Sequence, residues 1–143
     1  MPEKTKILDE ITKEIFSDIK SSPNKDEAAK ISAFIKLIVN GDMPIDYLKI
    51  DANLTKNKPG IIVYILTDRR LIKIDIDTAT AAIKSSNFII SKIISIDFNL
   101  AQGKTEVLVN FENGSFGLSY PFENDKITEF FQKVDQLRLA FFV

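Results

Sequence analysis

Two adjacent arginines, Arg69 and Arg70, lie between two apolar runs in the stretch YILTDRRLIKIDID. The planar guanidinium group donates paired hydrogen bonds to phosphate or carboxylate, so this pair could capture an anion. Three lysines occur close by in the sequence, two before the first apolar run and one within the second. The candidate anion-binding residues are therefore Lys56, Lys58, Arg69, Arg70 and Lys73.

The same residues also have a structural interpretation, and the sequence favours it. Arg69 and Arg70 fall at the tip of a predicted hairpin, where Arg70 could bond carbonyl groups or Asp68 and hold the turn in shape. Lys56 and Lys58 lie in the loop TKNKPG, where lysines are usually solvated. Anion binding is thus the alternative to a structural role for this set.

Catalytic and metal-binding chemistry has little support in the sequence. The chain contains no histidine and no cysteine, which removes the commonest general base, the commonest metal ligand and the thiol nucleophile. Asp75 and Asp77 could act together as acid and base or bind a hard cation, but a polar outer strand face explains them better. Serine and lysine in SSNFIISK lack a nucleophile elbow and an oxyanion loop. We expect no enzyme, no metal site and no cofactor.

Composition limits the function further. The chain has 143 residues, and 19 Lys and Arg against 20 Asp and Glu give a net charge of −1. This balance lacks the basic surface typical of duplex-binding proteins, so we expect no nucleic-acid partner. The N-terminus has no apolar core of a signal peptide, and no stretch reaches the ~18 apolar residues of a membrane span. We expect a cytoplasmic protein whose stability is nearly flat between about pH 5 and 8, because no side chain present has its ordinary pKa in that window.

Two amphipathic helices are predicted to precede a β-rich region. The first has the apolar stripe Ile7, Leu8, Ile11, Ile15 and Ile19, and the second has Ala28, Ile31, Ile35 and Ile38. The break SSPN separates them, with Asn24 or Ser22 as the cap of the second helix, which ends near Gly41. The predicted division is an accessory helical segment, residues 1–45, and a second domain, residues 46–143.

From Tyr47 the apolar period changes from 3.6 to two, and YLKIDANLT predicts a half-buried strand. The arginine-bearing stretch predicts an antiparallel hairpin in which Ile65 faces Ile72 and Tyr64 faces Lys73. A slip by one residue would move Lys73 into the core, so this register is strongly specified. Because the turn lacks Gly and Asn, a four-residue loop is favoured over a two-residue one.

A second hairpin is predicted at Asn113-Gly114, which favours a type I′ turn and places Phe111 opposite Phe116. Between the hairpins, one or two strands are predicted, with a bulge or sharp bend at the isoleucine doublets around Ser91-Lys92. A final helix, capped by Asn124 or Asp125, has the stripe Ile127, Phe130, Phe131, Val134, Leu137 and Phe141. Leu139, Phe142 and Val143 lie off this stripe and either pack into their own domain or contact another chain.

Seven short strands followed by one amphipathic helix is the order of the pleckstrin-homology (PH) fold. The stretch IIVYILTDRRLIKID resembles the strand-turn-strand signature of bacterial PH-like domains, including the YokE-like group. NFIISKIISID, ENGSFGLSYPF and KITEFFQKVDQL are similar to the segments that follow it in that family. The resemblance covers about residues 46–143. It implies an α+β, mainly β fold: a partly open, seven-stranded antiparallel barrel capped by a C-terminal helix. The two N-terminal helices predicted above precede this barrel and lie outside the resemblance.

The resemblance leaves two functions open. Lipid-binding PH domains carry a K-x(n)-[KR]-x-R pattern from the first strand pair, but the strand IIVYILT has no Arg or Lys, so that pattern is not met. We therefore expect a non-enzymatic binding or scaffolding module whose partner is a protein or a second copy of the chain. The alternative is a peripheral module that binds anionic lipid or a phosphate ligand through the five cationic residues named above.

Overall fold

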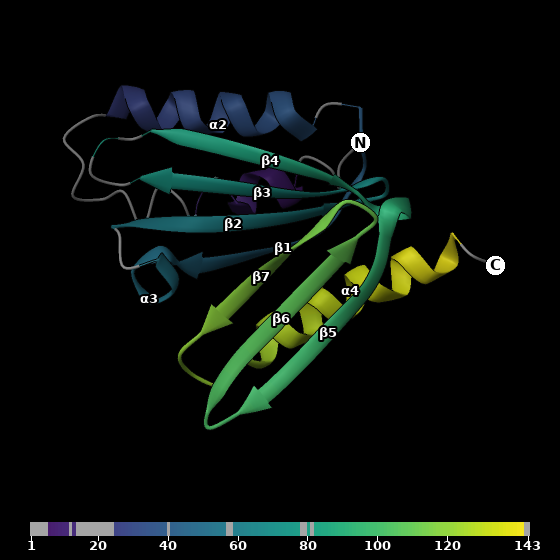
Figure 1. Cartoon of the computed structure of the whole chain (residues 1–143). Coiled ribbons are helices and arrows are strands. Elements are labelled where there is room, and N and C mark those ends of the chain that lie inside the picture. The colour runs from purple at the N-terminus through teal and green to yellow at the C-terminus, as the bar shows by residue number, and fades with distance from the viewer. Residues whose placement is uncertain are drawn as a thin grey trace.

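The computed structural model describes residues 6–11, 13, 25–39, 41–56, 59–77, 80 and 82–141. Two antiparallel sheets meet at the connection between β4 and β5 and diverge from it (Figure 1). The larger sheet has the strand order β1-β2-β3-β4 and the smaller one β5-β6-β7. The α+β fold with seven antiparallel strands, a C-terminal helix and N-terminal helices is thereby confirmed.

The strands are β1 (Pro44–Asp51), β2 (Gly60–Thr67), β3 (Arg70–Asp77), β4 (Ile83–Ile89), β5 (Ile93–Ala101), β6 (Lys104–Phe111) and β7 (Gly114–Tyr120). The helices are α2 (Lys25–Val39), α3 (Ala52–Lys56), the 3-10 turn η1 (Ile90–Lys92) and α4 (Asp125–Ala140). A first helix includes residues 6–11 and 13.

The N-terminal helices pack on one face of the larger sheet and form what we call the outer core. Leu8 and Ile11 of the first helix and Ile31, Ile35 and Val39 of α2 are buried there against β2 and β3. Ile15, Ile19 and the predicted caps Ser22 and Asn24 lie outside the described residues. The predicted apolar stripes therefore cover a sheet face wherever the structure describes them.

The first strand lies nearer the N-terminus than predicted, because it begins at Pro44 and not at Tyr47. It ends at Asp51, and residues 52–56 form the short helix α3 instead of continuing the strand. The Asp51 carboxylate accepts a hydrogen bond from the Asn53 amide at 2.9 Å, a local bond that competes with strand pairing. Ala52 then turns into the core, where it is buried.

The first hairpin has the predicted register, with Ile65 opposite Ile72 and Tyr64 opposite Lys73. The pairing of β2 with β3 ends at Leu66 opposite Leu71, so residues 67–70 form a four-residue loop. The Thr67 hydroxyl holds this loop, because it accepts hydrogen bonds from the amides of Arg69 at 3.2 Å and Arg70 at 2.9 Å. Every residue of β2 is buried, because the helices cover one face of this strand. The smaller sheet and α4 cover the other face and form the inner core.

The register of the second hairpin differs from the prediction by two residues. Phe111 pairs with Gly114, and Val109 pairs with Phe116, so the turn is Glu112-Asn113 and not Asn113-Gly114. A shift of two residues keeps every side chain on its face, so the apolar alternation cannot distinguish the two registers. In the observed register the Phe116 ring stacks on Phe88 of β4, with ring centroids 4.6 Å apart.

The predicted bend between β4 and β5 is present as η1, and the C-terminal helix begins where its cap was predicted. The Asn124 side chain accepts a hydrogen bond from the Ile127 amide at 3.2 Å. Phe130 and Phe131 are buried, but Phe141, predicted on the core stripe, is 51% exposed beyond the end of α4. Phe142 and Val143 lie outside the described residues. Among the helices of the described chain, none combines the length and apolar character that crossing a membrane requires.

Tyr64 lies at the centre of the inner core, and its hydroxyl is buried. The ring meets Phe131 edge-on at 5.3 Å and stacks with Phe116 at 6.4 Å. The hydroxyl has no hydrogen-bond partner among the described residues. Burial, with a smaller contribution from the Asp75 charge, raises the pKa of Tyr64 well above its ordinary value.

We expect Tyr64→Phe to stabilise the chain by about 1 kcal/mol at pH 7, because it removes a buried donor that lacks a partner. Above about pH 10 an exposed tyrosine loses its proton, whereas Tyr64 keeps its proton while folded. Stability of the wild type should therefore fall with rising pH, by up to about 1.4 kcal/mol per unit from this group. Urea unfolding of both proteins at pH 7 and about pH 11 measures the difference. If the wild type and Tyr64→Phe lose the same free energy of unfolding between the two pH values, Tyr64 does not keep its proton in the folded state.

Candidate functional site

Arg70, one of the five predicted anion-binding residues, is held by protein groups. Its Nε lies 2.6 Å from Oδ2 of Asp42, and its two Nη atoms donate to the Ile38 carbonyl at 2.7 Å and Asn87 Oδ1 at 2.9 Å. The Asp42 side chain is 9% exposed and that of Arg70 25%. We call this the Asp42–Arg70 joint. It connects the end of α2, the start of β3 and strand β4.

The joint continues into the hairpin loop. Asp42 Oδ2 also accepts a hydrogen bond from the Thr67 hydroxyl at 3.0 Å, and Thr67 is fully buried. Asp68 accepts a bond from the Met43 amide through its side chain, and its own amide donates to the Met43 carbonyl, both at 3.0 Å. The Thr-Asp-Arg-Arg sequence of the hairpin thus fixes the loop against the segment between α2 and β1. These contacts support a structural role for Arg70.

The other four predicted residues are spread along the hairpin. Arg69 is exposed at the loop, and Lys73 is half-buried on β3, where it has an interaction partner. Lys56 ends α3, at the opposite end of β2 from Arg69, and Lys58 lies outside the described residues. The eight residues of β2 separate those two ends by roughly 25 Å. The described part of the chain therefore does not bring the predicted cations together into one site.

The carboxylates Asp75 and Asp77 are half-buried on β3, and each has an interaction partner. Within the described residues no group of three or more acidic side chains could hold a metal ion. In the part of the chain that the structure describes, these two aspartates interact with neighbouring groups of the fold and have no third acidic ligand for a cation beside them.

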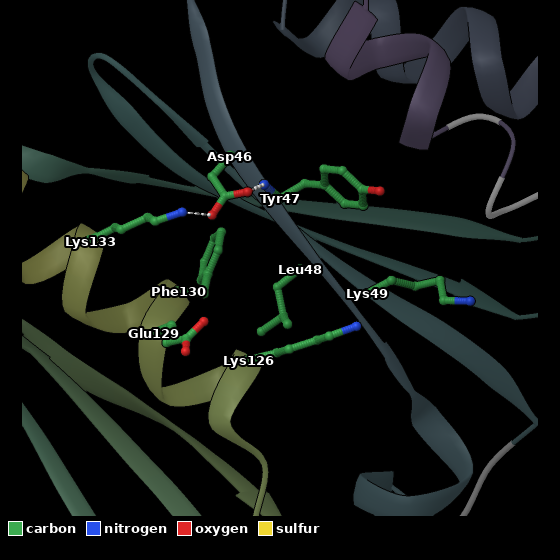
Figure 2. Close-up of a pocket in the computed structure, with 8 residues that line it drawn as sticks. All are labelled: Asp46, Tyr47, Leu48, Lys49, Lys126, Glu129, Phe130 and Lys133. Atoms are coloured by element: carbon green, nitrogen blue, oxygen red, sulfur yellow. Dashed lines mark hydrogen bonds and ion pairs between the residues drawn. The ribbon is translucent and has the colours of Figure 1, made fainter.

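A groove between strand β1 and helix α4 is the strongest candidate site. It has a volume of about 270 Å³ and is lined by Asp46, Tyr47, Leu48, Lys49, Lys126, Glu129, Phe130 and Lys133. Figure 2 shows Leu48 pointing from β1 toward the helix and Phe130 pointing from the helix toward the strand. Both belong to the inner core, where Leu48 is 6% and Phe130 2% exposed, so they form a closely packed floor with little apolar surface open to the β1–α4 groove.

Charged side chains of both signs surround this floor. Lys133 Nζ lies 2.8 Å from Oδ2 of Asp46, an ion pair that links α4 to β1 at one end of the groove. Lys126 and Glu129 are exposed, and Figure 2 shows the Lys126 side chain extending from α4 toward β1. Asp46 is oriented further by the Tyr47 amide, which donates to its other oxygen at 2.8 Å. The arrangement offers a partner the Lys126 ammonium and the Glu129 carboxylate beside apolar residues that are themselves almost fully buried.

The sequence contained a partial signal for this groove. Charged residues recur at helical spacing beside the apolar stripe of α4, at Lys126, Glu129 and Lys133. Side chains in these positions must flank the surface on which the helix packs. Nothing in the sequence places β1 opposite them, since Asp46 and Lys133 are 87 residues apart. The candidate therefore emerges only from the packing of α4.

A second pocket, of about 500 Å³, lies over strands β5 to β7 and includes Thr55. Its charged residues are Asp97 and Glu106, and Asp97 already accepts a hydrogen bond from Asn110 at 3.0 Å. It lacks the cation that would complement a carboxylate or phosphate, so the β1–α4 groove offers the more varied chemistry.

No protein-family model matches this sequence, and no curated protein is significantly similar to it. The function proposed for the chain therefore rests on the geometry of its surfaces.

Proposed function

We propose that the chain is a non-enzymatic binding module of PH-like type, whose β1–α4 groove receives a segment of a protein partner. The observation that carries the proposal is the groove itself, in which charged side chains of both signs from two elements surround the buried residues Leu48 and Phe130. Polar and charged groups of this kind form the rim of protein interfaces. Two sheets of four and three strands with a capping C-terminal helix are also consistent with the PH-like type.

The size of the groove favours a side chain of a partner over a metabolite. At about 270 Å³ it is smaller than the roughly 300–1,000 Å³ typical of small-molecule sites. An acidic side chain of the partner would lie near Lys126, and a basic one would lie near Glu129. Because the helix and strand are already packed, such a partner would bind with little rearrangement of the module.

The alternative, anionic-lipid binding through the predicted cations, has weaker support. Arg70 is engaged by Asp42, and Lys56 lies at the far end of β2 from Arg69. We expect no measurable binding to vesicles of phosphatidylserine and phosphatidylcholine, compared with phosphatidylcholine alone, at low salt. Co-sedimentation measures this. Binding to the anionic vesicles that weakens as salt is raised would favour the lipid function instead, because screening is the signature of an electrostatic contact.

Site-specific photo-crosslinking tests the groove. A benzophenone amino acid replaces Lys126 in the groove or, as the matched control, Lys104, an exposed lysine on β6 outside it. Irradiation in cells of the source organism should give a discrete adduct from position 126 that position 104 does not give. Adding Lys133→Glu, which removes the ion pair at the rim, should reduce the yield of that adduct. Identical adducts from both positions would contradict binding at the groove.

A further inference from the structure

Strand β4 is an edge of the larger sheet, and its pairing has none of the irregularities found at two of the other edges. Among the described strands β3 is its one neighbour, and their pairing runs from Arg70 opposite Ile89 to Ile76 opposite Ile83 without a bulge. By contrast, β1 and β5 each have a register irregularity, and α3 lies against β7. The helix α2 packs its apolar side chains on a face of the sheet, so it does not supply a hydrogen-bonding neighbour to β4. Proteins usually shield such an edge with bulges, prolines or several charges.

The direction of the main-chain groups of β4 follows from its pairing. The Asp77 amide donates to the Ala82 carbonyl at 2.9 Å, and the Ile90 amide donates to the Arg69 carbonyl at 3.0 Å. The main-chain groups of the odd-numbered residues of β3 therefore form the hydrogen bonds to β4. Their partners in β4 are the even-numbered residues Lys84, Ser86 and Phe88. Main-chain groups alternate in direction along an antiparallel strand.

The odd-numbered residues of β4 thus direct their amides and carbonyls away from the sheet. For Ser85 and Asn87, these main-chain groups have no hydrogen bond to any other described element. A row of unpaired donors and acceptors on a regular strand is a template for another extended strand.

The side chains of β4 make the strand complementary to itself. In an antiparallel pair centred on Ser86, Ser85 lies opposite Asn87 of the second strand and Lys84 lies opposite Phe88. At the two ends Ile83 meets Ile89, which is 51% exposed in the single chain. Lys84 is the one charged residue of the strand, and in this register it does not face its own copy, so no like charges oppose each other.

We propose that β4 pairs with β4 of a second copy of this chain about a twofold axis at Ser86, which joins two four-stranded sheets into one eight-stranded sheet. The Ser85–Asn87 pairs supply the new main-chain hydrogen bonds on both sides of the axis. The β1–α4 groove lies at the opposite edge of the larger sheet, so each copy keeps its groove accessible. The dimer is independent of the binding function proposed above.

A cysteine placed at the axis tests the register directly. The chain has no cysteine, so Ser86→Cys introduces a single thiol. In a non-hydrogen-bonded antiparallel pair the two Cα atoms are about 4.5 Å apart, within the range that a disulfide spans. Mild oxidation should convert most of the variant into a disulfide-linked dimer that reductant reverses. The matched control Ser119→Cys, at an exposed serine of β7, should give only the background of random collisions.

The mass of the unmodified chain completes the test. Light scattering during gel filtration should give twice the 16.2 kDa of one chain. Ser85→Pro removes an outward amide without breaking the ladder to β3, so it should give a folded monomer with an unchanged circular dichroism spectrum. If Ser85→Pro fails to fold, the comparison of the two cysteine variants still shows whether β4 pairs with a second copy. A monomeric wild type, or equal crosslinking of Ser86→Cys and Ser119→Cys, would overturn the proposal.

Discussion

A chain that ends at Glu123 is expected to be insoluble or unfolded, because α4 supplies one side of the inner core. The helix buries Ile127, Phe130, Phe131 and Val134 against both sheets. Burial of one such side chain contributes about 1.5–3 kcal/mol, and whole domains are stable by about 5–15 kcal/mol. Removing the helix therefore exceeds what the remaining chain can lose. Thermal unfolding followed by circular dichroism measures the outcome.

Single substitutions in and beyond α4 separate the contribution of side-chain packing from the effect of shortening the chain. Phe131→Ala should cost about 3–5 kcal/mol, since the ring is fully buried and packs on Tyr64. Phe141→Ala is the matched control, because that ring is 51% exposed, and it should change stability by no more than about 0.5 kcal/mol. If the truncated chain stays soluble and unfolds cooperatively, α4 is not part of the structural core.

The second large effect is expected at the Asp42–Arg70 joint. Arg70→Ala should destabilise the chain by about 2–4 kcal/mol, because it removes a donor to the Ile38 carbonyl and leaves the Asp42 carboxylate with only the Thr67 hydroxyl and no cation. The estimate is below the full cost of breaking a buried pair, since a quarter of the Arg70 side chain remains in water. Urea unfolding of the variant and the wild type measures the free-energy difference.

The adjacent arginine is the control. Arg69 is exposed and contributes only its main chain to the loop, so Arg69→Ala should stay within about 0.5 kcal/mol of the wild type. The double variant Asp42→Ala with Arg70→Ala should be less destabilised than the sum of the single variants, because both partners of one contact are then removed. Equal losses for Arg69→Ala and Arg70→Ala would show that the joint does not stabilise the fold.

The two hairpins show which part of the fold the sequence determines. In the first, a one-residue slip would bury Lys73, and this cost made the register predictable. In the second, the observed and predicted registers differ by two residues and present the same faces, so only the turn and the packing of Phe116 on Phe88 separate them. Periodicity therefore predicts faces reliably, while tertiary stacking decides between registers that share those faces.

The candidate sites show a similar limit. The chemistry of Arg70 was recognisable, but its partner Asp42 is 28 residues away and could not be assigned before the fold was known. Lys56 and Arg69 looked close because only a strand separates them in the sequence, yet an extended strand places its ends far apart. The β1–α4 groove depends entirely on the packing of two elements from opposite ends of the fold.

The most direct test of the binding function is the affinity of the groove for the partner recovered from the position 126 adduct. Isothermal titration should give one site per chain for the wild type. Lys126→Glu should raise the dissociation constant at least tenfold, because it reverses the charge beside the floor of the groove. Lys104→Glu makes the same charge change outside the groove and should leave the affinity unchanged. Equal affinities for all three proteins would contradict a partner site between β1 and α4.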